Sequence, residues 1–308
     1  MSTSLRTIGQ TMGQTVGKVS ETVTDGFLFL LLANICLSTV PIAVKIGLTP
    51  DTSVFALLVF RVLLASLMLW VYFLAFKRDT IRFDQAGLFS CLLAAIANCF
   101  SMFCNFMAIS YIDASLMVIV NTTTFIAVVI LLLMMQGEQP SRLDLIRFLI
   151  GSVGVYLFVG VLGELHWLGI LLAMATAFFY GIHVTIIQVR LSAYDSQGVT
   201  LYVITFMTLI LGSIYLALGS RWPTFGPVTW GALLWLALVA TGMARIFLFI
   251  GIKRAGSRQA ALLMPFGTLL TVGLATWLLN ESVTLQQWLG TVLVVVSVAL
   301  GARAKKRA

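Results

Sequence analysis

Long apolar stretches separated by short polar connections dominate the chain from residue 26 to residue 302. A helix needs about 20 apolar residues to cross the hydrocarbon core of a bilayer. The pattern therefore predicts ten membrane-spanning helices, at about 26–48, 53–76, 86–109, 114–136, 145–162, 166–189, 198–219, 228–251, 257–279 and 284–302. Connections as short as "YIDA" at 111–114 place consecutive helices antiparallel and next to each other.

Composition supports an all-α integral membrane protein, with the lipid bilayer as its surroundings. The chain is 60% hydrophobic and 10% charged, whereas a soluble domain carries about 25% charged residues. The net charge of +8 resides mainly in short loops and in the C-terminal "RAKKRA", so we expect no nucleic-acid partner. The four cysteines all fall in apolar stretches and are interpreted as packing residues. We expect no metal site and no cofactor.

The basic residues also predict the orientation. If the N-terminus is cytoplasmic, fifteen Lys and Arg residues fall in cytoplasmic segments and only Arg221 falls in an outer loop. Cytoplasmic loops carry the excess of positive charge. Both termini are therefore expected inside a multi-pass protein of the cytoplasmic (inner) membrane. The sequence favours neither a monomer nor a homodimer.

An internal repeat appears when the sequence is shifted by 143 residues. Phe106 then falls on Phe249, Glu138 on Glu281, and the predicted helix boundaries coincide without a gap. Each repeat holds five helices, and an odd number makes the second copy enter the membrane from the opposite side, as in many transporters. We predict an N-terminal tail at 1–25, inverted repeats at 26–162 and 163–302, and a basic C-terminal tail at 303–308.

The repeat carries a family resemblance. The run "LLMPF", the following "LNE" and then "WLG" resemble the second EamA domain of the drug/metabolite transporter superfamily, and "MMQGE" with its following helix resembles the first. The resemblance implies a ten-helix carrier with a central cavity lined by both halves, and most bacterial members are assigned to metabolite export. Two positions depart from the pattern: Thr122 stands opposite Pro265, and Arg147 stands opposite Gly290.

The polar residues within the spans are the candidate substrate ligands. Asp and Glu occur only in tails, loops and helix ends, and Glu281 and Glu138 are each expected to stabilise the start of the next helix. Arg245 is the deepest charge, about 12 Å from Lys253 along its helix. Arg61 can bind either substrate or backbone carbonyls. The full candidate set is Arg245, His183, Asn34, Asn105, Asn121, Arg61, Pro265 and Tyr180.

Each candidate also has a structural interpretation. A lone membrane histidine or asparagine can serve as a hydrogen bond between helices, although His183 is the deep group that titrates near neutral pH. Tyr180 can stack on a flat substrate or pack against neighbours. Pro265 removes one helical hydrogen bond and either lines a cavity or only kinks its helix.

Buried cations without buried carboxylates favour an anionic substrate. We expect a secondary active or facilitative transporter that exports a small metabolite by alternating access, such as an amino acid or a related carboxylate. The sequence lacks a GxxxxGK[ST] nucleotide motif. A lipid or lipid-linked headgroup flippase of the same superfamily is the alternative. A polytopic membrane enzyme is disfavoured, because catalytic groups do not cluster near His166 or His183, and we expect the protein not to be an enzyme.

Overall fold

The computed structural model describes residues 26–50, 52–76, 83–135, 142–159, 166–219, 223–255 and 257–304. This part of the chain forms ten helical spans and no β-strand. The first span, Gly26–Gly47, includes α2 (Val40–Gly47). The others are α3 (Val54–Phe76), α4 (Gln85–Tyr111), α5 (Ala114–Met135), α6 (Arg142–Val159), α7 (Trp167–Arg190), α8 (Ser196–Ala217), α9 to α10 (Pro227–Ala255), α11 (Ser257–Leu278) and α12 (Leu285–Ala304).

The predicted spans are confirmed, with boundaries shifted by only a few residues. Six of the helices are long and apolar enough to cross a membrane, and four shorter apolar stretches lie in α5, α6, α11 and α12 among the described residues. The eighth span is interrupted within the bilayer: α9 (Pro227–Trp235) leads into a π-helix, η2 (Leu236–Met243), which continues as α10 (Ala244–Ala255). The apolar pattern at 228–251 predicted one regular helix here.

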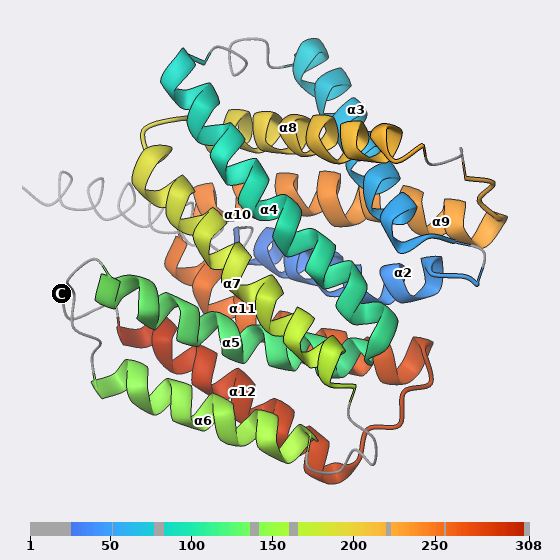
Figure 1. The fold of residues 1–308 in the computed structure, drawn as a ribbon. Helices are drawn as coiled ribbons and strands as arrows, with labels where there is room; N and C mark the ends of the chain where they lie inside the picture. The colour runs from blue at the N-terminus through green and yellow to red at the C-terminus, as the bar shows by residue number, and fades with distance from the viewer. Residues whose placement is uncertain are drawn as a thin grey trace, which may run out of the picture.

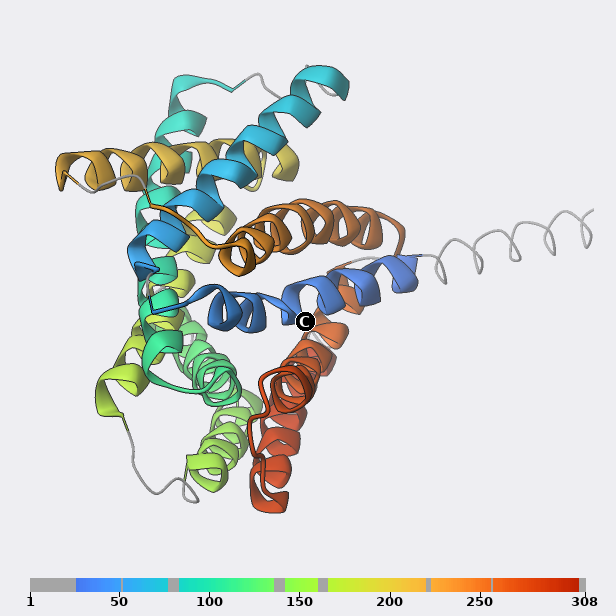
Figure 2. The same ribbon diagram turned by 90° about the vertical axis from the view of Figure 1, so that its right-hand side faces the viewer.

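The helices form two groups with a third layer between them. Figure 2 shows α3 and α8 on one side, α11 and α12 on the other, and α2 with the α9–α10 span between them. Figure 1 shows α4 and α7 crossing the bundle next to each other, and α5 and α6 beside α12. α12 ends at the end of the bundle where α4 and α8 begin, which charge asymmetry predicts to be cytoplasmic.

The contact between α6 and α12 follows the inverted repeat residue by residue. A Cβ atom added to Gly154 would lie 2.6 Å from the carbonyl oxygen of Gly290, so the two backbones touch. Under the 143-residue shift this pair maps onto Arg147 and Ser297, and Arg147 Nε donates to the Ser297 carbonyl at 3.1 Å. The two contacts are therefore related by the symmetry that the sequence predicted. Arg147 replaces a glycine in this symmetry, so the second contact is a side-chain hydrogen bond.

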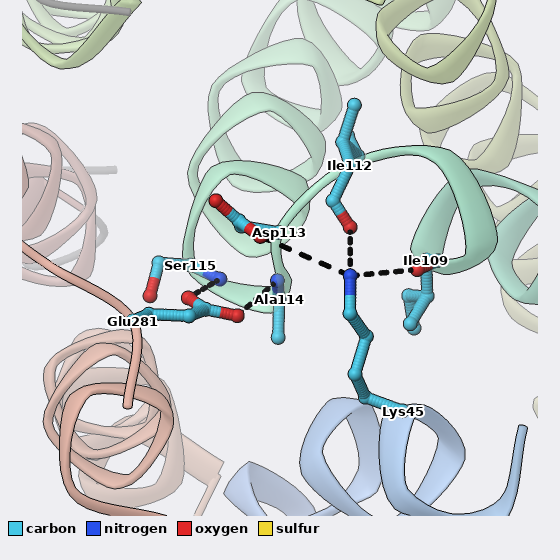
Figure 3. A network of polar contacts seen from close by, with 7 residues as sticks. All are labelled: Lys45, Ile109, Ile112, Asp113, Ala114, Ser115 and Glu281. Carbon is cyan, nitrogen blue, oxygen red and sulfur yellow. Dashed lines mark hydrogen bonds and ion pairs between the residues drawn. The ribbon is translucent and has the colours of Figure 1, made fainter. Parts of the chain in front are cut away.

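A network of polar contacts closes the end of the bundle that is predicted to face outward (Figure 3). Lys45 Nζ donates to the carbonyls of Ile109 and Ile112 at 3.3 and 3.0 Å and lies 3.8 Å from the Asp113 carboxylate. A cation at the C-terminus of α4 offsets the negative end of the helix dipole. Lys45 is thus fixed to the neighbouring helix end.

Glu281 corrects one expectation from the sequence. Its carboxylate accepts hydrogen bonds from the backbone N–H groups of Ala114 and Ser115 at 2.9 and 3.2 Å. Glu281 therefore stabilises the start of α5, in the other repeat, and not the start of the next helix as predicted. The start of α12 is held instead by Gln287, which accepts from Thr284 N at 2.8 Å. Glu138 lies outside the described residues.

The opposite end is joined by a second contact. The Tyr194 hydroxyl, before α8, donates to Asp84 Oδ1 at 2.6 Å, and Gly87 N in α4 donates to the same oxygen at 3.0 Å. These two hydrogen bonds hold the pKa of the Asp84 carboxyl below its usual range. The start of α4 is thereby tied to the connection between α7 and α8.

Candidate substrate-binding site

The structure brings together three of the predicted residues from three different helices. Arg61 on α3 and Arg245 on α10 lie close enough for their positive charges to repel, and His183 on α7 lies within the same range of Arg245. Sequence spacing cannot show such proximity, because the three residues belong to separate spans. The cluster combines both repeats.

Arg61 is buried, with only 7% of its surface exposed. Its guanidinium lies over the Phe106 ring at 5.4 Å from the centroid, a cation–π contact that partly replaces lost hydration. Within the described segments it has neither a carboxylate partner nor a hydrogen bond to a backbone carbonyl. The structural alternative for Arg61, binding of helix-end carbonyls, is therefore not observed there.

Arg245 also lacks a hydrogen bond or ion pair among the residues that the structure describes. It lies ten residues before Ala255, the end of its helix, which is about 15 Å at 1.5 Å per residue. An arginine at this depth is costly unless it meets water or an anion. Two arginines that repel each other and lack acceptors among the described residues form a region of positive charge suited to an anionic group.

The π-helix directly before Arg245 determines where this side chain points. The Ala244 N–H bonds to the Val239 carbonyl, five residues back, and the Thr241 hydroxyl bonds to the Leu236 carbonyl at 2.8 Å. A π-segment turns the rest of the helix relative to a regular one, and such segments occur frequently at functional sites. The π-helix was not predicted from the sequence, in which "ATGM" at 240–243 offers only a weak signal.

Arg245 lines a cavity of about 130 Å³. Its walls come from α3, α8 and α10, and its residues are Leu69, Tyr72, Phe73, Gln197, Thr200, Arg245, Ile246 and Ile250. A cavity of about 150 Å³ admits one benzene molecule, so a space of this size fits a small molecule. Tyr72, Gln197 and Thr200 were not predicted as site residues, because they lie near the ends of the predicted spans.

Tyr180 lies on the inward face of α7. The most exposed side chains of α7 form a stripe that includes Leu171 and Phe178, and Tyr180 lies about 200° round the helix from Phe178 at 3.6 residues per turn. Nevertheless, 39% of Tyr180 is exposed. Its ring lies 5.7 Å from those of His183 and Phe125. Tyr180 therefore borders an internal space beside His183.

The three asparagines lie on the first span, α4 and α5. Asn34 is buried; it donates to the Leu30 carbonyl at 3.0 Å, and its Oδ1 faces Gly267 of α11. Asn105 donates to Met117 Sδ at 3.8 Å. Asn121 is half-buried on α5. Their assignment as substrate ligands stays a prediction.

Pro265 lies within α11, which is helical through this position from Ser257 to Leu278. The surroundings of its side chain lie outside the described part of the structure, so its predicted cavity-lining role stays a prediction. The counterpart Thr122 in α5 bonds its hydroxyl to the Val118 carbonyl at 2.7 Å.

Comparison with known proteins assigns the family. The family model of the EamA-like transporters matches residues 24–160 and again 167–302. The chain belongs to the EamA-like transporter family. The resemblance noted from the sequence is thereby confirmed, together with the repeated all-helical membrane fold and the function of a transporter.

Two further similarities agree with this EamA-like assignment. The chain is 26% identical over 270 residues to an uncharacterized transporter of Archaeoglobus fulgidus, covering 84% of this chain and 91% of the relative. A protein with a solved crystal structure is similar in fold, with a TM-score of 0.63 at 18% identity over 93% of this chain and 99% of the other. Neither similarity names a substrate.

Proposed function

We propose that this EamA-like protein is a secondary active or facilitative carrier that exports a small carboxylate-bearing metabolite, an amino acid or a related compound, across the cytoplasmic membrane. Its mechanism is alternating access, in which the two inverted halves expose one central site to each side in turn. Arg245 and Arg61 bind the carboxylate. Export is the direction that the family resemblance implies.

One observation carries the proposal. Arg61 and Arg245 are close enough to repel, and neither has an acidic partner in the described chain. Bringing like charges together inside a membrane is unfavourable unless an anion compensates them. Arginine presents a planar fork of donors that matches a carboxylate in two parallel hydrogen bonds. A carboxylate between the two guanidinium groups would relieve the repulsion and satisfy their donors.

Thermal unfolding of the purified protein tests the proposal against anionic, zwitterionic, cationic and neutral metabolites. A ligand at 100 times its Kd stabilises the folded form by about 2.7 kcal/mol. We expect carboxylates to raise the unfolding temperature of the wild type and not that of Arg245→Met. Arg190→Met, at the exposed end of α7, is the matched control and should respond like wild type.

The same panel separates the alternatives. Equal stabilisation of wild type and Arg245→Met by neutral or cationic compounds would contradict an anion site. Stabilisation by phospholipids, with no response to soluble carboxylates, would favour a lipid flippase instead.

A further inference from the structure

The two ring nitrogens of His183 have different surroundings. Nδ1 lies 2.9 Å from the Ala94 carbonyl oxygen of α4. A carbonyl oxygen can only accept, so Nδ1 must carry the proton of this hydrogen bond. In the neutral ring, Nε2 is then a hydrogen-bond acceptor. Packing of α7 against α4 thus fixes the tautomer of His183.

Nε2 has no hydrogen-bond partner in the described segments, and it is not completely enclosed. Among these residues, the fully enclosed side-chain nitrogen and oxygen atoms without a partner are Ser115 Oγ and Thr123 Oγ1. Nε2 also lacks a partner but does not belong to this set, so the atom is not fully enclosed, although only 5% of His183 is exposed. It is therefore partly accessible, and the His183 ring lies 5.7 Å from that of Tyr180, which is also partly exposed.

We infer that His183 Nε2 accepts a hydrogen bond from an amino or hydroxyl group that the substrate carries next to its carboxylate. This inference rests on the proposed function, in which Arg245 beside His183 holds the carboxylate. A compact ligand can reach both residues when its donor group is on the carbon adjacent to the carboxylate, as in 2-amino and 2-hydroxy acids. His183 is then a specificity residue.

The physical reason for specificity is the cost of an unpaired buried acceptor. A substrate without the donor group would displace water from Nε2 and offer it nothing in return. Sites built to hydrogen-bond one substrate group reject analogues that lack it far more strongly than apolar pockets reject a missing methylene. The substrate class is therefore a carboxylate with an adjacent hydrogen-bond donor, and simple carboxylates bind weakly.

Two matched sets of acids test this inference on the full-length protein. The first is alanine, lactate and propanoate, and the second is phenylalanine, 3-phenyllactate and 3-phenylpropanoate. Within each set only the group next to the carboxylate changes, so size is controlled. For at least one set, we expect the amino acid or the hydroxy acid to bind wild type about tenfold or more tightly than the simple acid, measured by titrated thermal stabilisation.

Two substitutions of His183 separate specificity from folding. His183→Asn keeps an amide N–H near the position of Nδ1, which can still bond to Ala94, but has no atom at the position of Nε2. His183→Gln places a side-chain acceptor near the position of Nε2. We expect His183→Asn to remain folded and to bind the three acids of a set equally, and His183→Gln to retain part of the discrimination.

The outcomes distinguish this inference from the proposed function. If wild type binds all three acids of each set equally and Arg245→Met binds none, the anion site stands and the role of His183 is overturned. Discrimination that is retained in His183→Asn but lost in His183→Gln would also overturn it, because the hydrogen bond to Ala94 would then be the important one. If no acid of either set binds wild type, the proposed function fails, and the inference fails with it.

Discussion

The carboxylate of Glu281 bonds to two N–H groups at the start of α5, a helix more than 160 residues away in sequence. The first N–H groups of any helix lack partners within the helix, and a negative charge there also favours the helix dipole. The sequence therefore predicts the kind of role that Glu281 has. It cannot identify the helix that benefits, because this depends on how the two repeats pack.

Glu281→Gln tests this interaction. The amide keeps one acceptor oxygen but loses the charge, so we expect the free energy of unfolding to fall by about 1 kcal/mol. Thermal unfolding in detergent measures the change. Gln286→Ala, an exposed position on the first turn of α12, is the control and should change stability by less than about 0.5 kcal/mol. Indistinguishable unfolding of the two variants would exclude an energetic role for the Glu281 carboxylate.

The residues of the candidate site could likewise be predicted from the sequence, but not their contacts with one another. Arg245, Arg61 and His183 are recognisable in the sequence because charged and titratable groups are rare inside membrane helices. Their mutual proximity is a product of packing among α3, α7 and α10, and periodicity within one helix carries no information about it. Tyr72, Gln197 and Thr200 escaped recognition, because polar residues near helix ends are unremarkable in a sequence.

At the level of elements, helix boundaries were the most predictable feature. Apolar length determines where a span can begin and end, and local caps such as Asp84 before α4 agree with it. The π-helix at 236–243 was not predictable, because its residues satisfy a regular helix equally well by composition. The backbone contact between α6 and α12 was not predicted. The sequence showed only that Arg147 stands where the other repeat has a glycine.

Gly154→Ala tests the contact between α6 and α12. The added methyl group would lie 2.6 Å from the Gly290 carbonyl oxygen, so the helices must separate, at a cost of about 1–3 kcal/mol. Gly231→Ala in α9, where an added Cβ meets nothing within 4 Å, should be neutral or stabilising by up to about 1 kcal/mol. Resistance to denaturation of the two purified variants measures the difference. A Gly154→Ala protein as stable as the Gly231→Ala protein would mean that the helices separate without cost.

At the level of the whole molecule, the inverted repeat relates the cavity at one end of the bundle to a packed region at the other end. The cavity beside Arg245 contains Tyr72, whose counterpart under the 143-residue shift is Tyr215. Tyr215 is buried, with its ring 5.9 Å from Phe55 and 6.1 Å from Phe60. One end of the bundle is thus hollow where its symmetry mate is packed with aromatic rings. This asymmetry is that of a carrier with its site accessible from one end, predicted to be the cytoplasmic one.

Cysteine accessibility tests this asymmetry. Thr200 lines the cavity, and its counterpart Leu57 is 0% exposed. We expect Thr200→Cys to react with a water-soluble maleimide about tenfold or more faster than Leu57→Cys, because the reaction needs access to water. The four native cysteines are buried and should give little background in wild-type protein. Equal reactivity at both positions would contradict a single open end.

The departures from symmetry at the centre have a consequence for how such a protein can arise. The positions equivalent to Arg61, Arg245 and His183 are Ile204, Met102 and Val40, so each half supplies groups that the other lacks. Two identical half-length subunits in opposite orientations could build the same scaffold, but every side chain at their axis would occur twice. Fusion into one chain frees each half to mutate alone, and the two halves can then build a site that distinguishes the two ends of its ligand.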